Sequence, residues 1–258
     1  MAIEVLLKVI YLFLTLVRNI PGLSNLDLLL EVLPQSMFLA RKIANFNNMT
    51  FRKYVTCSEC SSIYLPESCI KTGQNGEKQS EQCSFVRYPN HVQSRFREAC
   101  GKELMKIVSS IDGKKVYLYP KQMFCYFPLK NSIQNLINRK DARDQLLTGP
   151  TKSSDGVMCD TVDGEFFKTF QDSNGNWYFQ DPRNLGGILN IDWFKPFKNV
   201  KHSTGVIYIA LLNFPREIRF KWENVLLVGI IPGPNEPSLN VNTFLKPLVD
   251  EMLTFCSW

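Results

Sequence analysis

Six residues with metal-binding side chains lie close together in the first half of the sequence. Their order is Cys57-x2-Cys60-x8-Cys69-x13-Cys83-x7-His91-x8-Cys100. A Cys-x2-Cys pair can present two thiolates from one tight turn to a tetrahedral zinc ion. The pair is followed by "SSIYL", a stretch typical of a strand, as in a zinc-ribbon knuckle. We therefore predict a structural zinc site in this region.

The sequence leaves the full set of zinc ligands open. No second Cys-x2-Cys pair is present, and six candidates exceed the four ligands of one ion. Either two ions bind, or some of the six residues only pack. Buried free thiols are the alternative, but five cysteines within 44 residues, beside one of two histidines, favour metal. Because no H-E-x-x-H pattern is present, the predicted zinc is structural rather than catalytic.

A single carboxylate, Asp192, is the second feature that could do chemistry. It lies in "GGILNIDWF", directly before Trp193 and Phe194. An unpaired buried charge is costly, so such a residue is expected to be paired, to bind a metal or to lie at the mouth of a site.

Basic residues follow Asp192, with one acid, Glu217, among them. The cations, which we expect to contact a DNA backbone, are Lys195, Lys198, Lys201, Arg216, Arg219 and Lys221. A carboxylate at a strand end beside basic loops suits a magnesium site that faces phosphates. A salt bridge from Asp192 to one of these cations is the alternative.

Composition describes a folded protein in a reducing compartment. The chain has 258 residues, of which 45% are hydrophobic and 21% charged, so it can bury a sizeable core. Its net charge of +6 permits a polyanionic partner without demanding one. Glu4 and Lys8 interrupt the apolar N-terminus, and its apolar residues recur at helical spacing. We expect a helix packed on a core there, not a signal peptide or membrane anchor. In a reducing compartment, clustered cysteines indicate metal rather than disulfides.

The elements that position these residues fall into four regions. Residues 1–50 are predicted to be helical, with breaks at Pro21 and Pro34. Residues 51–130 form the zinc-binding module, which ends in the strand-like "GKKVYLYPKQMFCYFPL". Residues 131–185 hold a helix, "NSIQNLINRK", and a linker or surface loop, "DQLLTGPTKSSDGVM".

Residues 186–258 form the fourth region and differ from the others in amino-acid composition. Three apolar, β-branched runs, "GGILNIDWF", "GVIYIALLNF" and "VLLVGII", have the length of strands. They precede "VNTFLKPLVDEMLTF", in which Phe244, Leu245, Leu248 and Met252 recur at helical spacing. The order strand, strand, strand, helix, after the helical and cysteine regions, predicts an α+β fold.

Several segments carry a resemblance to a known family. The segments "ILNIDWFKPFK", "LLNFPREIRFKWENVLLVGIIPGPNEP" and "NTFLKPLVDEM" closely resemble transposases of CACTA (En/Spm) type DNA transposons. "KYVTCSECSSIY", "YPNHVQSRFREACG" and "YPKQMFCYFPL" resemble the segment before the catalytic domain in animal and fungal members. The likeness runs from about residue 34 to the C-terminus, and "PGPNEP" is its most specific block. "CDTVDGEFFKTF" also fits, although Phe167 stands where a tryptophan would be expected.

The resemblance implies a ribonuclease-H-like domain whose first strand carries the first acid of a three-carboxylate magnesium site. That role carries over to Asp192 alone; family members often have a glycine where this chain has Trp193. The family's second and third acids lie past the end of this chain, and one carboxylate leaves two magnesium ions underligated. We therefore expect an incomplete domain that does not cut DNA alone. Its strand at residues 187–194 should be a sheet edge that is prone to self-association.

The implied function is that of a fragment of a CACTA-type transposase, located in the nucleus and binding DNA weakly. The full-length relative would cleave and join DNA at transposon ends with magnesium. The competing hypothesis is a non-catalytic remnant that holds zinc and contacts nucleic acid or another protein. Neither a membrane nor a small-molecule substrate is expected as a partner.

Overall fold

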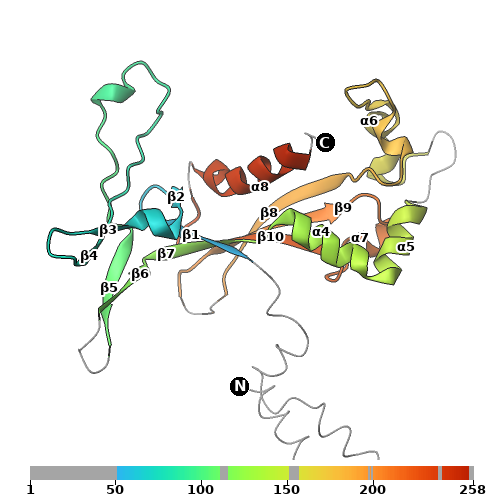
Figure 1. The fold of residues 1–258 in the computed structure, drawn as a ribbon. Coiled ribbons are helices and arrows are strands. Elements are labelled where there is room, and N and C mark those ends of the chain that lie inside the picture. The colour runs from blue at the N-terminus through green and yellow to red at the C-terminus, as the bar shows by residue number, and fades with distance from the viewer. Residues whose placement is uncertain are drawn as a thin grey trace, which may run out of the picture. The chain divides into compact units, whose positions relative to one another are not determined.

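The computed structural model describes residues 51–110, 116–150, 157–196, 198, 200–237 and 240–255. The helices predicted in residues 1–50 lie outside this part. The described residues contain five α-helices and a mainly antiparallel sheet, which confirms the predicted α+β class (Figure 1). Within the same residues, every helix is too short or too polar to cross a membrane.

A six-stranded sheet organises the described part of the chain. Its order is β2-β1-β7-β10-β9-β8, and each pair of neighbours is antiparallel. The strands are β1 (Arg52–Thr56), β2 (Ile63–Tyr64), β7 (Gln122–Tyr126), β8 (Gly187–Phe194), β9 (Thr204–Leu211) and β10 (Val225–Ile231). Strands that flank the cysteines therefore share one sheet with strands from the C-terminal region.

The C-terminal region has the predicted order of elements. β8, β9 and β10 coincide with the three apolar runs, and the helix α8 (Val241–Phe255) follows them. Among the described strands, β8 pairs only with β9, so the expectation that this strand is a sheet edge is confirmed.

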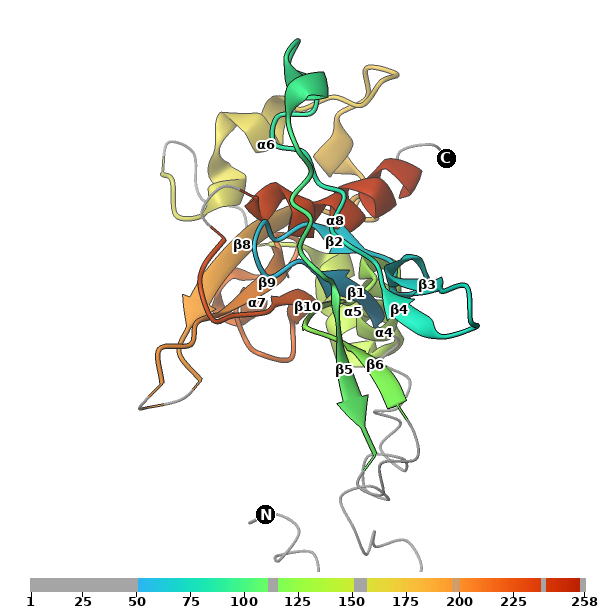
Figure 2. The ribbon, with the colours of Figure 1, turned by 90° about the vertical axis from the view of Figure 1, so that its left-hand side faces the viewer.

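Two small hairpins extend from the cysteine region (Figure 2). One pairs β3 (Ile70–Thr72) with β4 (Lys78–Ser80), and the other pairs β5 (Met105–Ser109) with β6 (Val116–Pro120). Short 3₁₀ turns lie at Pro66–Cys69, Ser94–Phe96, Thr161–Asp163 and Tyr178–Gln180.

Of the remaining helices, three follow β7 and precede β8, and the fourth lies between β9 and β10. They are α4 (Leu129–Asn138), α5 (Lys140–Thr148), α6 (Glu165–Thr169) and α7 (Arg216–Arg219). The predicted loop "DQLLTGPTKSSDGVM" is wrong at its start, because residues 144–148 belong to α5. Ala142 and Leu146, four residues apart, bury one face of this helix. Gly149 ends it with a φ of 72°, a conformation that favours glycine.

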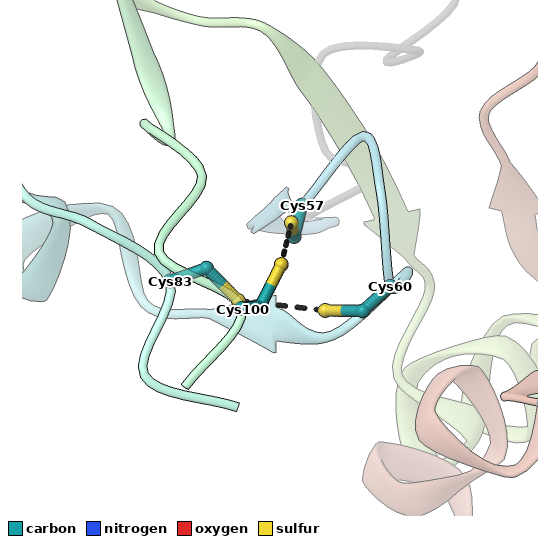
Figure 3. A group of neighbouring side chains, drawn as sticks. All are labelled: Cys57, Cys60, Cys83 and Cys100. Carbon is teal, nitrogen blue, oxygen red and sulfur yellow. Dashed lines mark hydrogen bonds between the residues drawn. The ribbon is translucent and has the colours of Figure 1, made fainter. Parts of the chain in front are cut away.

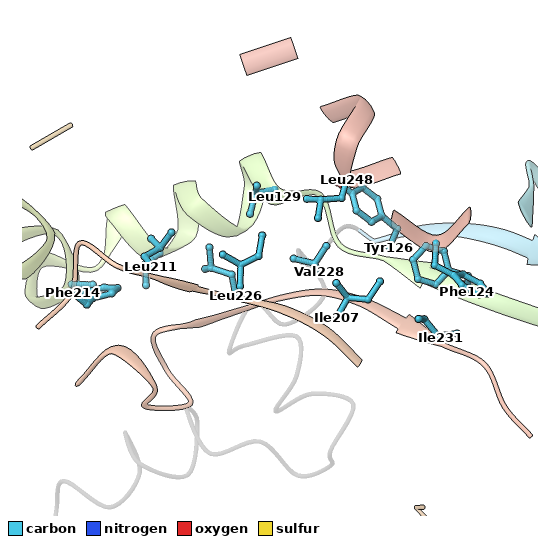
Figure 4. Packing of buried hydrophobic residues seen from close by; sticks show 14 of the residues in the cluster. Phe124, Tyr126, Leu129, Ile207, Leu211, Phe214, Leu226, Val228, Ile231 and Leu248 are labelled. Atoms are coloured by element: carbon cyan, nitrogen blue, oxygen red, sulfur yellow. The ribbon is translucent and has the colours of Figure 1, made fainter. Parts of the chain in front are cut away.

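The main core lies between the sheet and helices α4 and α8. Figure 4 shows Leu129 of α4 and Leu248 of α8 on the same side of Val228 in β10. Ile207, in the neighbouring strand β9, is fully buried in this layer. Alternate residues of β9 point into it, as the period of two in a strand requires.

Glu251 of α8 joins this helix to the start of α4. Its carboxylate accepts hydrogen bonds from the backbone N–H groups of Leu129 and Lys130, each at 2.9 Å, and from the Tyr126 hydroxyl. The first N–H groups of a helix have no partner within the helix, and the residue before α4 is Pro128, which offers no side-chain cap. Glu251 supplies that cap from a distant part of the sequence. Burial, as the main cause, and the Glu251 carboxylate, as the second, raise the pKa of Tyr126, so its hydroxyl stays protonated and donates.

Candidate metal centre

Four of the six candidate zinc ligands meet in one cluster, Cys57, Cys60, Cys83 and Cys100 (Figure 3). Their sulfur atoms all lie within 4.8 Å of one another. Sγ of Cys57 is 3.8 Å from Sγ of Cys100, and Sγ of Cys60 is 3.4 Å from Sγ of Cys83. Four sulfurs placed about 2.3 Å from a tetrahedral zinc would be about 3.8 Å apart. The cluster therefore has the composition and dimensions of a site for a metal such as zinc.

The first two cysteines lie on a tight turn between β1 and β2. The backbone N–H of Cys57 donates to the Ser62 carbonyl at 2.9 Å, and the Ser61 N–H donates to the Cys57 carbonyl at 3.0 Å. Ser61 has a φ of 61°, which is uncommon for a residue other than glycine. This reversal turns both thiols to the same side, as the Cys-x2-Cys spacing predicts.

The other two cysteines face each other across the base of a long loop. The Gly101 N–H donates to the Cys83 carbonyl at 2.9 Å, and the Cys100 N–H donates to the Phe85 carbonyl at 2.8 Å. These bonds form a short antiparallel pairing that brings the two thiols together. Sixteen residues separate the two cysteines, so their spacing alone could not select them.

The surroundings of the cluster are apolar, which affects the ionisation of its thiols. Cys57 and Cys83 are each 1% exposed. Burial raises the pKa values of Cys83 and Cys100. For Cys57 burial acts in the same direction, but hydrogen bonds from the N–H groups of Cys60 and Glu59 outweigh it and lower the pKa. The Tyr64 hydroxyl lies 3.1 Å from the Cys83 sulfur and can orient it from outside the cluster. Because the thiols must lose their protons to bind a cation, metal affinity should decrease as the pH is lowered.

Cys69 and His91 stand outside the cluster. Cys69 is fully buried, but its thiol donates to the Leu65 carbonyl at 3.3 Å. His91 is exposed, and its Nδ1 accepts a hydrogen bond from the Gln93 N–H at 3.2 Å. The four cysteines are the one group of three or more potential ligands found among the described residues.

Asp192 is exposed on the edge strand β8. One of its carboxylate oxygens accepts a hydrogen bond from the Trp193 N–H at 2.8 Å. The Leu212 N–H donates to the Gly186 carbonyl at the end of the β8–β9 ladder. Along an antiparallel strand, successive N–H groups point alternately toward and away from the neighbouring strand. Counted from Gly186, the Trp193 N–H points away from β9. Asp192 thus covers an outward-facing donor of the open edge. No ion pair among the described residues includes it, so the alternative of a salt bridge is not formed there.

The basic residues after Asp192 divide into two kinds. Lys195, Lys198, Lys201 and Lys221 are exposed. Arg216 is also exposed and donates to the Cys159 carbonyl at 2.6 Å.

Arg219 is different, and its assignment as a DNA-backbone contact is wrong. It is 1% exposed, and its guanidinium makes two bonds to the Asp160 carboxylate, at 2.8 and 2.7 Å. It also donates to the carbonyls of Leu212 and Phe214. The guanidinium is therefore shielded from solvent and cannot reach a phosphate.

Comparison with known families bears on the C-terminal part of the chain. Residues 155–257 match the family model described as "Transposase family tnp2". The match supports a transposase-family protein. It includes β8, β9, β10 and α8, and it contains Asp192. Neither the curated proteins nor the solved structures gave a significant match.

The tnp2-matched segment lies directly against the cysteine cluster. Asn240, just before α8, donates a side-chain hydrogen bond to the Cys60 carbonyl. In the "PGPNEP" stretch, the Gly233 carbonyl accepts from the Gln122 side chain at 2.6 Å, and the Pro234 carbonyl accepts from the Ser203 N–H at 2.8 Å. A cavity of about 500 Å³ lies between this stretch and the cysteine turn. The sequence indicates that "PGPNEP" is a specific block, but it gives no sign that this block lies beside the cysteine cluster.

Proposed function

We propose that this chain is a CACTA-type transposase polypeptide that is stabilised by structural zinc, contacts DNA in the nucleus and does not cut DNA alone. The observation that carries the proposal is the four-thiol cluster. The side chain of Asn240, in the tnp2-matched segment, donates a hydrogen bond to the Cys60 carbonyl and so connects the segment to this cluster.

Zinc would act here as a cross-link rather than a catalyst. Cys57, Cys60, Cys83 and Cys100 supply four protein ligands, which leaves no open position for water or substrate. The ion would tie the turn between β1 and β2 to the base of the loop that begins at Cys83. In small modules such binding contributes directly to folding.

Asp192 is the proposed magnesium ligand of the transposase reaction. Its exposure on the edge strand leaves the carboxylate accessible, which supports this role. It belongs to no group of three or more potential ligands among the described residues, and one carboxylate cannot hold two magnesium ions in place. We therefore expect no cleavage by this chain alone. The uncovered edge beside it is the proposed site of self-association.

Metal analysis of protein purified under reducing conditions tests the zinc proposal. We expect one zinc per chain, and loss of that zinc in Cys60→Ser. Cys125→Ser is the matched control, because this half-buried thiol lies in β7 outside the cluster. Cys69→Ser should likewise keep its zinc. Wild-type protein without zinc, or a Cys69→Ser protein that has lost it, would contradict the assignment.

Binding and cleavage assays test the DNA proposal. Binding should be weak and should fall steeply with salt, since it rests on Lys and Arg contacts to phosphate. Binding that does not change with salt would contradict this account. Magnesium-dependent cleavage that Asp192→Ala abolishes would show that the chain is active by itself.

A further inference from the structure

The loop between the metal ligands Cys83 and Cys100 combines exposed arginines with exposed rings. We call residues 84–99, "SFVRYPNHVQSRFREA", the Arg-aromatic loop. It contains three arginines, Arg87, Arg95 and Arg97, against one acid, Glu98. In Figure 1 it extends away from the sheet, on the side of the sheet away from α5.

Each arginine of this loop lies over an aromatic ring. The Arg95 guanidinium carbon is 4.8 Å from the centre of the Phe96 ring. Those of Arg87 and Arg97 lie 5.8 and 5.4 Å from the Tyr88 ring. Phe96 is 75% exposed and Tyr88 is 60% exposed, so the rings are not part of a core. The faces of both rings are therefore accessible to a partner.

One side-chain hydrogen bond and several backbone hydrogen bonds connect the parts of the loop. Arg97 donates from its guanidinium to the Arg87 carbonyl at 2.7 Å, which ties the two strands of the loop together. Near its tip, the His91 N–H donates to the Tyr88 carbonyl at 3.1 Å, and the Ser94 N–H donates to the His91 carbonyl at 2.8 Å. At its base the loop begins and ends at cluster cysteines. The arginines and rings are therefore positioned before any partner binds.

We propose that the Arg-aromatic loop is a binding surface for DNA with unpaired bases. Arg87 and Arg95 would contact phosphates, since a guanidinium matches phosphate oxygens in charge and geometry. Phe96 and Tyr88 would stack on bases, which every base allows because each has a π-face. Arg97 would act as a positioning residue through its bond to Arg87. This inference rests on the DNA interaction proposed above and assigns it a surface outside the tnp2-matched segment.

Binding of a single-stranded oligonucleotide over a series of salt concentrations tests the phosphate contacts. We expect Arg87→Gln/Arg95→Gln to reduce the slope of log affinity against log salt by about 1.4, at about 0.7 per phosphate contact. Lys140→Gln/Arg143→Gln in α5 is the matched control, because it removes the same charge from another exposed surface. The control should leave the slope unchanged. Zinc content equal to wild type shows that each variant keeps the folded cluster.

A second variant tests stacking. Phe96→Ser should weaken single-strand binding by between about 5-fold and 150-fold, the range for loss of one stacked base. Binding of the same sequence as a duplex should change much less. Equal losses on both substrates would overturn the stacking contact.

The two proposals fail in different ways. If the wild-type chain binds no DNA, the proposed DNA interaction and the loop assignment both fail. If it binds DNA but the loop variant behaves like the α5 control, only the loop assignment is overturned. Binding to a protein partner that needs Phe96, without any effect on DNA, would also overturn it.

Discussion

Replacement of Asp160 by asparagine should destabilise the protein strongly, because it leaves the buried Arg219 without its counter-charge. The Arg219 side chain is 2% exposed and that of Asp160 is 10% exposed. The substitution keeps the shape of the side chain but removes the negative charge that accepts two hydrogen bonds from the Arg219 guanidinium. Asp160 also accepts from the Thr161 N–H at 2.6 Å and caps the turn at Thr161–Asp163.

The expected cost is large relative to the stability of a domain. Removing one partner of a buried ion pair costs about 3–5 kcal/mol, because the remaining charge stays desolvated. Total stabilities are about 5–15 kcal/mol. With a denaturant slope of about 2–3 kcal/mol/M, the urea midpoint should fall by about 1–2.5 M.

Urea unfolding followed by circular dichroism measures this shift. The control is Asp181→Asn, since Asp181 and Arg183 form a pair of similar length, 2.6 Å, in which Arg183 is 82% exposed. Exposed pairs contribute little to stability, so this control should unfold close to wild type. A midpoint for Asp160→Asn as high as that of the control would refute the reasoning.

The same variant predicts a change in pH dependence. The Arg219 hydrogen bonds, opposed by burial, hold the pKa of Asp160 below its ordinary value. A lowered carboxyl pKa stabilises the folded state above the unfolded value of about 3.9, and this stabilisation is lost as the pH falls through the folded pKa. Wild type should therefore lose more stability than Asp160→Asn on acidification below about pH 4.

Three further substitutions test other contacts. Glu251→Ala removes the cap of α4 and should cost about 1–2 kcal/mol in urea unfolding. Asp250→Ala, at the preceding and exposed position, should cost less. Equal costs would argue against the cap. Gly205→Ala should cost about 1–3 kcal/mol by the same assay, because a Cβ there would collide with three ring carbons of Trp193 in the neighbouring strand; an unchanged midpoint would mean that the ring moves freely. Asp192→Ala should increase self-association in sedimentation velocity, since it uncovers the outward N–H of Trp193 on the open edge; a monomer at all concentrations would contradict this role.

The sequence predicts the C-terminal elements well because their signals are local. β8, β9 and β10 are β-branched apolar runs of strand length, and α8 repeats its apolar residues at helical spacing. Helix α5 was missed because its buried face consists of only Ala142 and Leu146, which lie among polar residues. The glycine that ends it resembled the start of a loop.

The long-range contacts could not be predicted from such local signals. The Cys-x2-Cys pair identified one half of the cluster, but the choice of Cys83 and Cys100 depends on how the loop between them closes. Arg219 looked like a surface cation because its partner lies 59 residues earlier. "DTVD" has the pattern of a helical cap, yet nothing nearby marks Asp160 as a counter-ion.

The pairing of β7 with β10 limits how this gene could be rearranged. Tyr126 lies opposite Gly229 and Cys125 opposite Ile230, which joins chain from before the tnp2-matched segment to its third strand. A recombination event that transferred only the codons for residues 155–257 would leave β7 and α4 behind. The transferred piece would then present a second open strand edge at β10, and Leu226 and Val228 would lose their cover from α4 and β7. A rearrangement that keeps these contacts must therefore move the cysteine region and the matched segment together, as a single inherited block.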